Sequence, residues 1–275
     1  MTALRNSRVY VGALIILVWG LAPFYWMVVT AFRDARYTFD TTPWPTHITL
    51  DNFRQALSTN AGNDFSRAVV NSLIVGGATT AIALLFGVLA AYALARSQFR
   101  FKYLVVGLIL GASMFPVVAL ATPLYQLFNS IGWLGSYWAM IIPNISFVLP
   151  LTIYTLVSFF RDLPWELEEA ARMDGASRAQ AFRMIMLPLA APAVFTTAIL
   201  AFIATVNEFL LASLLSNQRT EPVTVAIARF SGADPSVVPY ASIMAAGTIV
   251  VIPLVVLVLV FQRRIISGLT AGGVK

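Results

Sequence analysis

Long apolar runs alternate with shorter polar stretches along almost the whole chain. Each run is at least as long as the roughly 20 apolar residues that a helix needs to cross the hydrocarbon core of a bilayer. The runs show neither the strict alternation of a half-buried strand nor internal repeats. The pattern predicts an all-α polytopic membrane protein, a single transmembrane domain over residues 1–275. Its six spans are expected at about residues 10–32, 68–95, 103–128, 137–160, 189–215 and 240–261.

Composition supports a membrane environment. The chain is 59% hydrophobic and 11% charged, with a mean hydropathy of +0.81, whereas soluble domains have about 25% charged residues. The first run is too long for the apolar region of a signal peptide and lacks a small-residue cleavage site, so we expect an uncleaved first span. The absence of cysteine excludes disulfides and thiolate chemistry, and the single His47 argues against a histidine metal site.

The distribution of basic residues predicts how the chain is oriented. If both termini lie in the cytosol, the inner segments hold twelve of the eighteen basic residues, mostly in short loops and at span ends, as expected for cytoplasmic loops. This orientation makes residues 33–66 and 216–239 external loops and residues 161–188 a cytosolic loop. It also accounts for the net charge of +6 without a nucleic-acid partner. We therefore expect a multi-pass membrane protein with both termini in the cytosol, in contact with lipid.

The cytosolic loop is the longest polar interruption in the sequence. Asp162 and Pro164 are typical of a helix start, and residues 165–173 favour helix. Gly175 supplies the permissive backbone that commonly follows a helix end. Ser177 and Gln180 have the spacing of a capping box and open a second helix. The local pattern therefore predicts a helix, a glycine turn and another helix.

Two further features bear on how this loop works. Pro188 is expected to close the second helix near the start of the fifth span. Ala170 and Ala171 would leave a low surface for the close approach of a partner, with charged side chains at its flanks. The alternative is a solvated amphipathic loop that only joins two spans. A DNA-binding helix-turn-helix is disfavoured, because the stretch is acidic and tethered to the bilayer at both ends.

Polar residues within the spans are candidates for a substrate pathway. Glu208 is the one acid within a predicted span, and such a residue is costly in lipid and therefore a functional hypothesis. Its alternatives are a place near the outer interface or a role in capping a broken helix. Asn207 beside it could form a hydrogen bond with a substrate hydroxyl or with a neighbouring helix. Further candidates, for which helix packing or interface anchoring is the alternative, are Asn144, Tyr125, Tyr154 and Asn71.

No catalytic motif is present in the sequence. A nucleotide-binding P-loop needs a lysine after a glycine, but Lys102 follows Phe101 and Lys275 follows Val274. The sequence also lacks HExxH and GxSxG motifs. We therefore expect a non-catalytic chain that binds no cofactor or metal of its own. If transport uses ATP, the ATP and Mg²⁺ must be bound by separate subunits.

Several short stretches together resemble a known family. Glu169-Ala170-Ala171, Gly175 and Ile185-x-Leu187-Pro188 resemble, at the same spacing, the EAA motif of ABC importer permeases. The carbohydrate-uptake, MalG-like branch, which includes trehalose- and maltose-type permease subunits, is resembled by stretches elsewhere. These are Leu50-Asp51-Asn52-Phe53, Asn71-Ser72, Met114-Phe115-Pro116, Asn207-Glu208-Phe209, Arg263-Arg264 and Gly268-Leu269-Thr270-x-Gly272.

The resemblance implies a fold, a function, a set of partners and a location in a bacterial cytoplasmic (inner) membrane. The fold would be that of a type I ABC importer permease, with a cytosolic coupling helix that docks in a groove of an ATPase subunit. The docking residues would be Glu169, Ala170, Ala171, Arg172, Met173, Asp174 and Gly175. The complex would contain a second, homologous permease as a heterodimer partner and two ABC ATPases. An extracellular or periplasmic sugar-binding protein would bind the loop at 216–239 and deliver a di- or oligosaccharide such as trehalose or maltose.

Three other functions compete with sugar import. A secondary carrier would work without an ATPase, but it would be expected to show more intramembrane ionisable residues and an inverted repeat, and neither is found in the sequence. An ABC permease for a peptide or polyamine would share the EAA pattern. A structural or assembly subunit would give that pattern no role.

Overall fold

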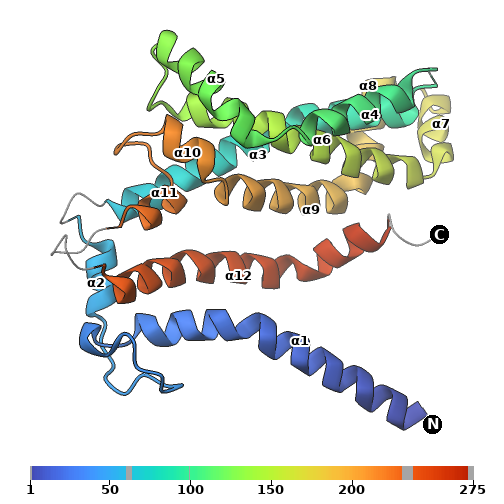
Figure 1. Ribbon diagram of the computed structural model, residues 1–275. Helices are drawn as coiled ribbons and strands as arrows, with labels where there is room; N and C mark the ends of the chain where they lie inside the picture. The colour runs from blue at the N-terminus through green and yellow to red at the C-terminus, as the bar shows by residue number, and fades with distance from the viewer. Residues whose placement is uncertain (1, 60–63, 99, 231–237, 272–275) are drawn as a thin grey trace. The chain divides into compact units, whose positions relative to one another are not determined.

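The computed structural model describes residues 2–59, 64–98, 100–230 and 238–271. Helices make up almost all regular structure within these ranges (Figure 1). The extended backbone pairs there only in an isolated antiparallel bridge between Arg33 and Ile48. The predicted all-α class is therefore confirmed.

The chain divides into two compact units. The first consists of Met1–Ser66 with Ala226–Val255, and the second of Arg67–Val225 with Val256–Lys275. Every site residue predicted from the sequence falls in the second unit. The prediction of a single transmembrane domain stays a prediction.

The first unit contains a long apolar helix and an ordered loop. Its elements are α1 (Thr2–Ala31), the short 3-10 helix η1 (Ala35–Tyr37), α2 (Asp51–Leu57) and the first part of α12 (Tyr240–Ala271). Near its end, the loop after α1 forms the short helix α2. Asp51 is the first helical residue of α2. Leu50 occupies the cap position and gives no side-chain hydrogen bond.

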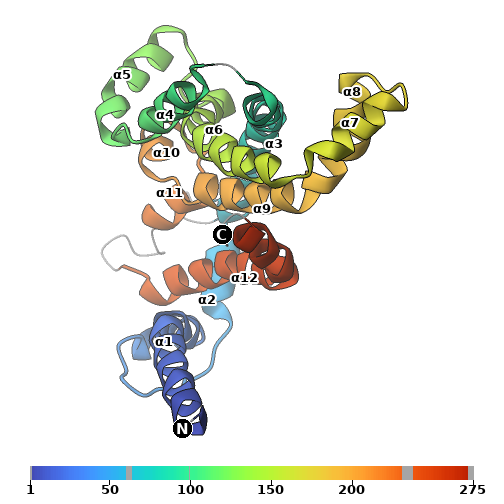
Figure 2. The same cartoon turned by 90° about the vertical axis from the view of Figure 1, so that its right-hand side faces the viewer.

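The second unit is a bundle of apolar helices with short helices at both ends. Its elements are α3 (Phe65–Arg96), α4 (Lys102–Ser113), α5 (Val117–Ser130), α6 (Tyr137–Asp162), α7 (Trp165–Met173), α8 (Arg178–Ala181), the π-helical turn η3 (Phe182–Met186), α9 (Leu187–Val206), α10 (Leu210–Leu215) and α11 (Val223–Ala228), which runs across the boundary between units. Helix α6 packs against α4 and α9. Figures 1 and 2 show α7 and α8 at the opposite end of this unit from α5 and α10.

Five helices in the described chain are long and apolar enough to cross a membrane, and the region predicted as the third span is different. There, α4 and α5 form a pair bent by 80° at a short break. Pro116 has an extended backbone (φ −66°, ψ 120°) and takes the N-cap position of α5. A proline also disfavours helical backbone in the residue before it. The two helices together count as a sixth span only as a broken one.

The region predicted as the fifth span is also divided. Helix α9 ends at Val206, and α10 begins only at Leu210. The predicted span at 189–215 therefore contains a break, which holds Asn207 and Glu208. Because broken helices free backbone groups that need other partners, such a break survives in a membrane only where protein or a water-lined cavity surrounds it.

Close packing of α3 against α6 leads to a stability prediction. A β-carbon added at Gly87 would lie 2.6 Å from Cγ2 of Thr152, which is almost fully buried. Gly77, on the same helix, has nothing within 4 Å of such an atom. We expect Gly87→Ala to destabilise the protein by about 1–3 kcal/mol through overpacking. Gly77→Ala should be neutral or stabilising, because alanine favours helix.

Thermal unfolding of the full chain in detergent micelles measures both effects. The matched pair separates packing from helix propensity, which favours alanine at both positions. Equal melting temperatures for the two variants would contradict the close approach of α3 and α6.

Candidate functional site

The polar segment folds as its local sequence predicts. Helix α7 spans Trp165–Met173, and Gly175 follows in the left-handed region with φ +90°. The Ser177 hydroxyl accepts a hydrogen bond from the Gln180 backbone N–H at 3.3 Å, and the Gln180 side chain accepts one from the Ser177 N–H at 2.8 Å. The predicted capping box is therefore present, and it fixes the start of α8.

The expected helix end at Pro188 is wrong. Residues Arg178–Val206 form one apolar helical run that passes through Pro188. The five-residue π-helical turn η3 directly precedes this position, and the Leu187 N–H donates to the Phe182 carbonyl, five residues back. A wider turn gives the proline ring room where an ordinary helix would set it against a carbonyl. The second helix of the segment is therefore continuous with α9.

Most of the predicted docking residues lie on the surface of the second unit. Glu169, Ala170, Arg172, Asp174 and Gly175 are exposed, and Met173 is 88% exposed. Ala171 differs, because it is buried within the chain at 7% exposure. Of the alanine pair, only Ala170 therefore offers a low surface to a partner.

The two adjacent glutamates of α7 lie in different environments. The Glu169 carboxylate is exposed and accepts a hydrogen bond from Trp165 Nε1 at 2.6 Å. The Glu168 side chain is buried and accepts one from the Tyr92 hydroxyl at 2.7 Å. Sequence reasoning missed Glu168. The helical period would have signalled it, because Glu168 and the buried Ala171 are three residues apart on one face.

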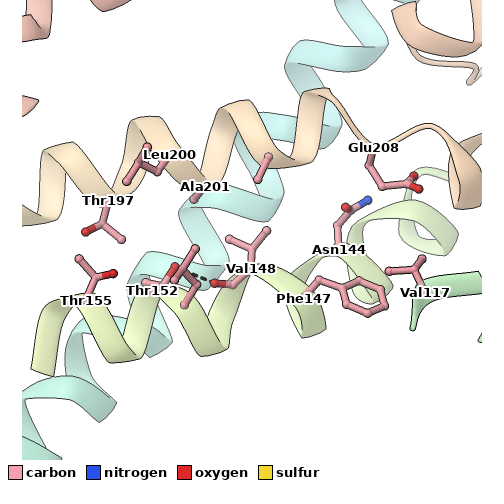
Figure 3. Close-up of a pocket in the computed structure, with 12 residues that line it drawn as sticks. Val117, Asn144, Phe147, Val148, Thr152, Thr155, Thr197, Leu200, Ala201 and Glu208 are labelled. Atoms are coloured by element: carbon pink, nitrogen blue, oxygen red, sulfur yellow. Dashed lines mark hydrogen bonds between the residues drawn. The ribbon is translucent and has the colours of Figure 1, made fainter. Parts of the chain in front are cut away.

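A pocket lies between α5, α6 and the end of α9 (Figure 3). Its volume is about 610 Å³, counting space open to solvent. The part of this space that a water-sized molecule can enter is about 160 Å³, which is below the range of small-molecule sites, about 300–1,000 Å³. The lining is mostly apolar, with Glu208 and Asn144 at one end and threonines toward the other. The lining residues are Val117, Asn144, Phe147, Val148, Leu151, Thr152, Thr155, Thr197, Leu200, Ala201, Ala204 and Glu208.

The Glu208 side chain has two roles in the structure. Its carboxylate oxygens accept hydrogen bonds from the backbone N–H groups of Leu211 at 2.8 Å and Ala212 at 3.0 Å. These are among the donors that a helix leaves unpaired in its first turn. Glu208 therefore caps α10 in the broken helix and also lines the pocket. The hydroxyl of Thr224 donates to its backbone carbonyl at 3.1 Å.

The other pathway candidates separate into two groups. Asn144 is buried, and its amide faces the Glu208 carboxylate in Figure 3 while donating to the Met140 carbonyl at 3.0 Å. Tyr125, Tyr154 and Asn207 are exposed and are not among the residues that line this pocket. The structure therefore brings together Glu208 and Asn144 only.

Asn71 lies away from the pocket lining and is buried. Its amide donates to the backbone carbonyls of Arg219 and Glu221, each at 3.0 Å, and it accepts from the Tyr137 hydroxyl at 2.7 Å. Asn71 therefore holds the start of the loop after α10 against α3 and α6. These contacts fit a packing role for Asn71, which was the alternative to a place in the substrate pathway.

Comparison with known proteins shows which family has this sequence and fold. Residues 83–270 match the model of the binding-protein-dependent transport system inner membrane component family. The trehalose transport system permease protein SugB of Mycobacterium tuberculosis is 43% identical over 95% of this chain and 94% of its own length. The trehalose/maltose transport system permease protein MalG of Thermococcus litoralis is 39% identical over 99% of this chain and 98% of its own.

Solved structures show the same fold. A chain of a bacterial ABC transporter involved in the import of the acidic polysaccharide alginate covers 94% of this chain and 97% of its own length, with a TM-score of 0.74 at 21% identity. Together with the apolar helices, the family match identifies a multi-pass inner membrane protein. The chain belongs to the family of binding-protein-dependent transport system inner membrane components, the permease subunits of ABC importers.

Proposed function

We propose that this chain is the permease subunit of a sugar importer, with a di- or oligosaccharide of the trehalose or maltose type as its cargo. The observation that carries the proposal is the full-length similarity to the SugB and MalG permeases, at 43% and 39% identity. A related permease for sulfoquinovosyl glycerol, SmoH of Agrobacterium fabrum, is 39% identical over 97% of this chain. Carbohydrate transport is therefore a common property of these relatives.

In this proposal, α7, the glycine turn and α8 dock on a separate ABC ATPase. The segment is acidic, exposed and rigidly capped, and Ala170 permits close approach. The basic residues in the short inner loops support cytosolic termini and a cytosolic docking segment. A second, homologous permease would complete the pathway, and two ATPase subunits would bind ATP and Mg²⁺. A binding protein would deliver the sugar from the other side, as the family description indicates.

The pocket at the break between α9 and α10 is the proposed contact site for the sugar. Sugars present many hydroxyls, which bind carboxylates and amides, while their C–H faces pack on apolar side chains. Glu208 and Asn144 supply the polar groups at one end, and Phe147, Leu151 and Leu200 supply apolar surface. Because Glu208 is already fixed by two backbone donors, it is pre-organised to accept hydrogen bonds from a hydroxyl.

Uptake by the reconstituted complex tests this function. The full chain is purified with the subunits that co-purify, placed in proteoliposomes and supplied with radiolabelled trehalose, maltose or a peptide. We expect sugar uptake that requires ATP and the binding protein. Uptake driven by a proton gradient without ATP would establish a secondary carrier instead, and peptide uptake alone would overturn the sugar assignment.

Glu208→Gln should separate sugar contact from helix capping. Glutamine keeps one oxygen that can accept from α10, while its NH2 group cannot accept from the second backbone N–H. It also loses the charge: a hydrogen bond to a charged group contributes about 1.5–3 kcal/mol, against about 1 kcal/mol for a neutral one. We expect uptake to fall about three- to tenfold, since 1.4 kcal/mol corresponds to a factor of ten. The melting temperature should fall only slightly, because one of the two backbone donors of α10 keeps its acceptor.

Asp51→Asn is the control, because it also changes a carboxylate to an amide, at an exposed position on α2. A lower melting temperature of the Glu208→Gln protein with uptake unchanged per folded molecule would show that Glu208 serves only as a cap.

A further inference from the structure

A buried group of side chains joins the docking helix to the end of α3. The Nε atom of Arg96 lies 3.2 Å from Oε2 of Glu168, with side-chain exposures of 9% and 12%. Neither atom has an aligned hydrogen-bond partner in the described chain, so the contact is an ion pair. The other oxygen of Glu168 accepts from the Tyr92 hydroxyl at 2.7 Å. One carboxylate on α7 is thus held by two residues of α3.

Further contacts fix both partners of the carboxylate. The Arg96 guanidinium lies 4.7 Å from the ring centroid of Trp165, at the start of α7, and its Nη2 donates to Sδ of Met186 at 3.8 Å. Cations at this distance from an indole are attracted by its ring. The Tyr92 ring packs against Phe182 with its centroid 4.5 Å away. Helix α3 therefore contacts both α7 and the π-helical turn before α9.

The connections of α7 along the chain are not helical. Between α6 and α7 the backbone is extended, with ψ 137° at Leu163 and ψ 123° at Pro164. At its other end α7 meets the turn that contains Gly175. Tertiary contacts must therefore hold α7 in place. It packs on α8 and the π-helical turn, and the side chains described above attach it to α3.

We propose that Arg96, Tyr92, Glu168 and Trp165 form a clamp, the α3–α7 clamp, that makes the docking helix and the second apolar helix move together. When α7 is displaced, the clamp carries the displacement into α3, which packs on α6 beside the pocket. Removing one charge breaks the pair and leaves the other buried without compensation, which is strongly unfavourable. The attachment itself stands on the contacts alone, while its role in transport rests on the proposed function.

The attachment can be measured without any partner. The chain has no cysteine, so two spin labels can be placed on the full chain at Ala93→Cys of α3 and Leu167→Cys of α7, both exposed. We expect a narrow distribution of label distances in the parent chain and in the Glu166→Gln control. Glu168→Gln should broaden it at least about twofold, because the amide keeps an acceptor for Tyr92 but no charge for Arg96.

The role in transport is measured on the purified complex in proteoliposomes, as sugar taken up per ATP hydrolysed. Glu168→Gln should lower this ratio at least about fivefold while the ATPase subunits still co-purify. Asp51→Asn, which also changes a carboxylate to an amide but at an exposed position on α2, should leave the ratio unchanged. A merely structural role would lower the yield of folded protein but not the ratio.

The outcomes distinguish the two proposals. An unchanged distance distribution in Glu168→Gln would overturn the clamp. A broadened distribution with an unchanged uptake ratio would overturn its role in coupling. If no ATPase co-purifies with the parent chain, the proposed function fails, and the distance measurement still decides whether the clamp exists.

Discussion

Replacing Gly175 by proline should abolish coupled transport while the apolar helices remain folded. Gly175 has φ +90° and donates its N–H to the Arg172 carbonyl at 3.1 Å. Proline fixes φ near −65° and has no N–H, so it can satisfy neither requirement. It also pushes the residue before it into extended backbone, whereas Asp174 has φ −75° and ψ 6°. The turn between α7 and α8 must therefore reorganise.

The expected size of the effect follows from the strain. A strained backbone conformation costs about 1–3 kcal/mol even for residues that can adopt it, and each 1.4 kcal/mol corresponds to a factor of ten. We expect uptake per ATP hydrolysed to fall at least about tenfold in proteoliposomes. Uptake per ATP should fall because α7 would no longer be held at a fixed angle to α8 and α9.

Gly132 offers a matched control for this change. It also has a positive φ, +72°, and it donates its N–H to the carbonyl three residues back, at 3.2 Å. It lies between α5 and α6, and α5 is at the opposite end of the unit from α7 (Figure 1). Gly132→Pro should disturb folding to a similar degree without lowering uptake per ATP hydrolysed. A similar loss of the ratio in both variants would contradict a specific role for the α7–α8 turn.

Arg33→Leu should release the loop that follows α1. Arg33 is fully buried, and its guanidinium donates to the carbonyls of Asp40 and Thr42 and lies 5.0 Å from the ring centroid of Trp26. Leucine would leave both carbonyls without their charged donor. A hydrogen bond to a charged group contributes about 1.5–3 kcal/mol, so we expect a loss of at least that size in the stability of the first unit. Amide hydrogen exchange should accelerate throughout residues 34–47.

Arg36 is the control for this second prediction. It is three residues away, and its side chain is 81% exposed beside Asp34. Exposed ion pairs contribute little to stability, so Arg36→Leu should leave exchange in the loop nearly unchanged. If Arg33→Leu also left exchange unchanged, Arg33 would not be what holds the loop in place.

Asp34, the partner of Arg36, makes the loop contact depend on pH. Hydrogen bonds from Arg36 lower the pKa of the Asp34 carboxyl to about 2. Because the pKa is lowered, the ionised carboxylate stabilises the fold at pH values above the ordinary pKa of 3.8. This stabilisation is lost as the pH falls toward 2. The loop contact is therefore intact at neutral pH and weakens only in strong acid.

Local rules explain what the sequence predicts correctly. The start of α7, the Gly175 turn and the Ser177 capping box depend on residues within a few positions of one another, so the pattern is sufficient. The apolar runs likewise depend only on length and hydropathy. The predicted all-α membrane architecture rests on these local features.

Long-range contacts could not be read in this way. Arg96 and Glu168 are far apart in the sequence, and only the packing of α3 on α7 brings them together. Nor does hydropathy show where a run breaks. The bends at Pro116 and at Asn207 depend on backbone geometry and on capping by groups such as Glu208. Pro188 shows the reverse case, since a π-helical turn lets the helix continue where a proline rule predicts its end.

The docking of α7 on a separate ATPase is the central claim, and thiol cross-linking tests it most directly. Because the chain has no cysteine, Ala170→Cys places one thiol on the exposed face of α7, and Ser130→Cys places one at the end of α5. Membranes that contain the whole complex are treated with a short reagent that reacts with the thiol at one end and, on illumination, with any neighbouring protein group at the other. The account predicts an adduct with the ATPase subunit from position 170 and none from position 130. No ATPase adduct from position 170, or equal adducts from both, would contradict it.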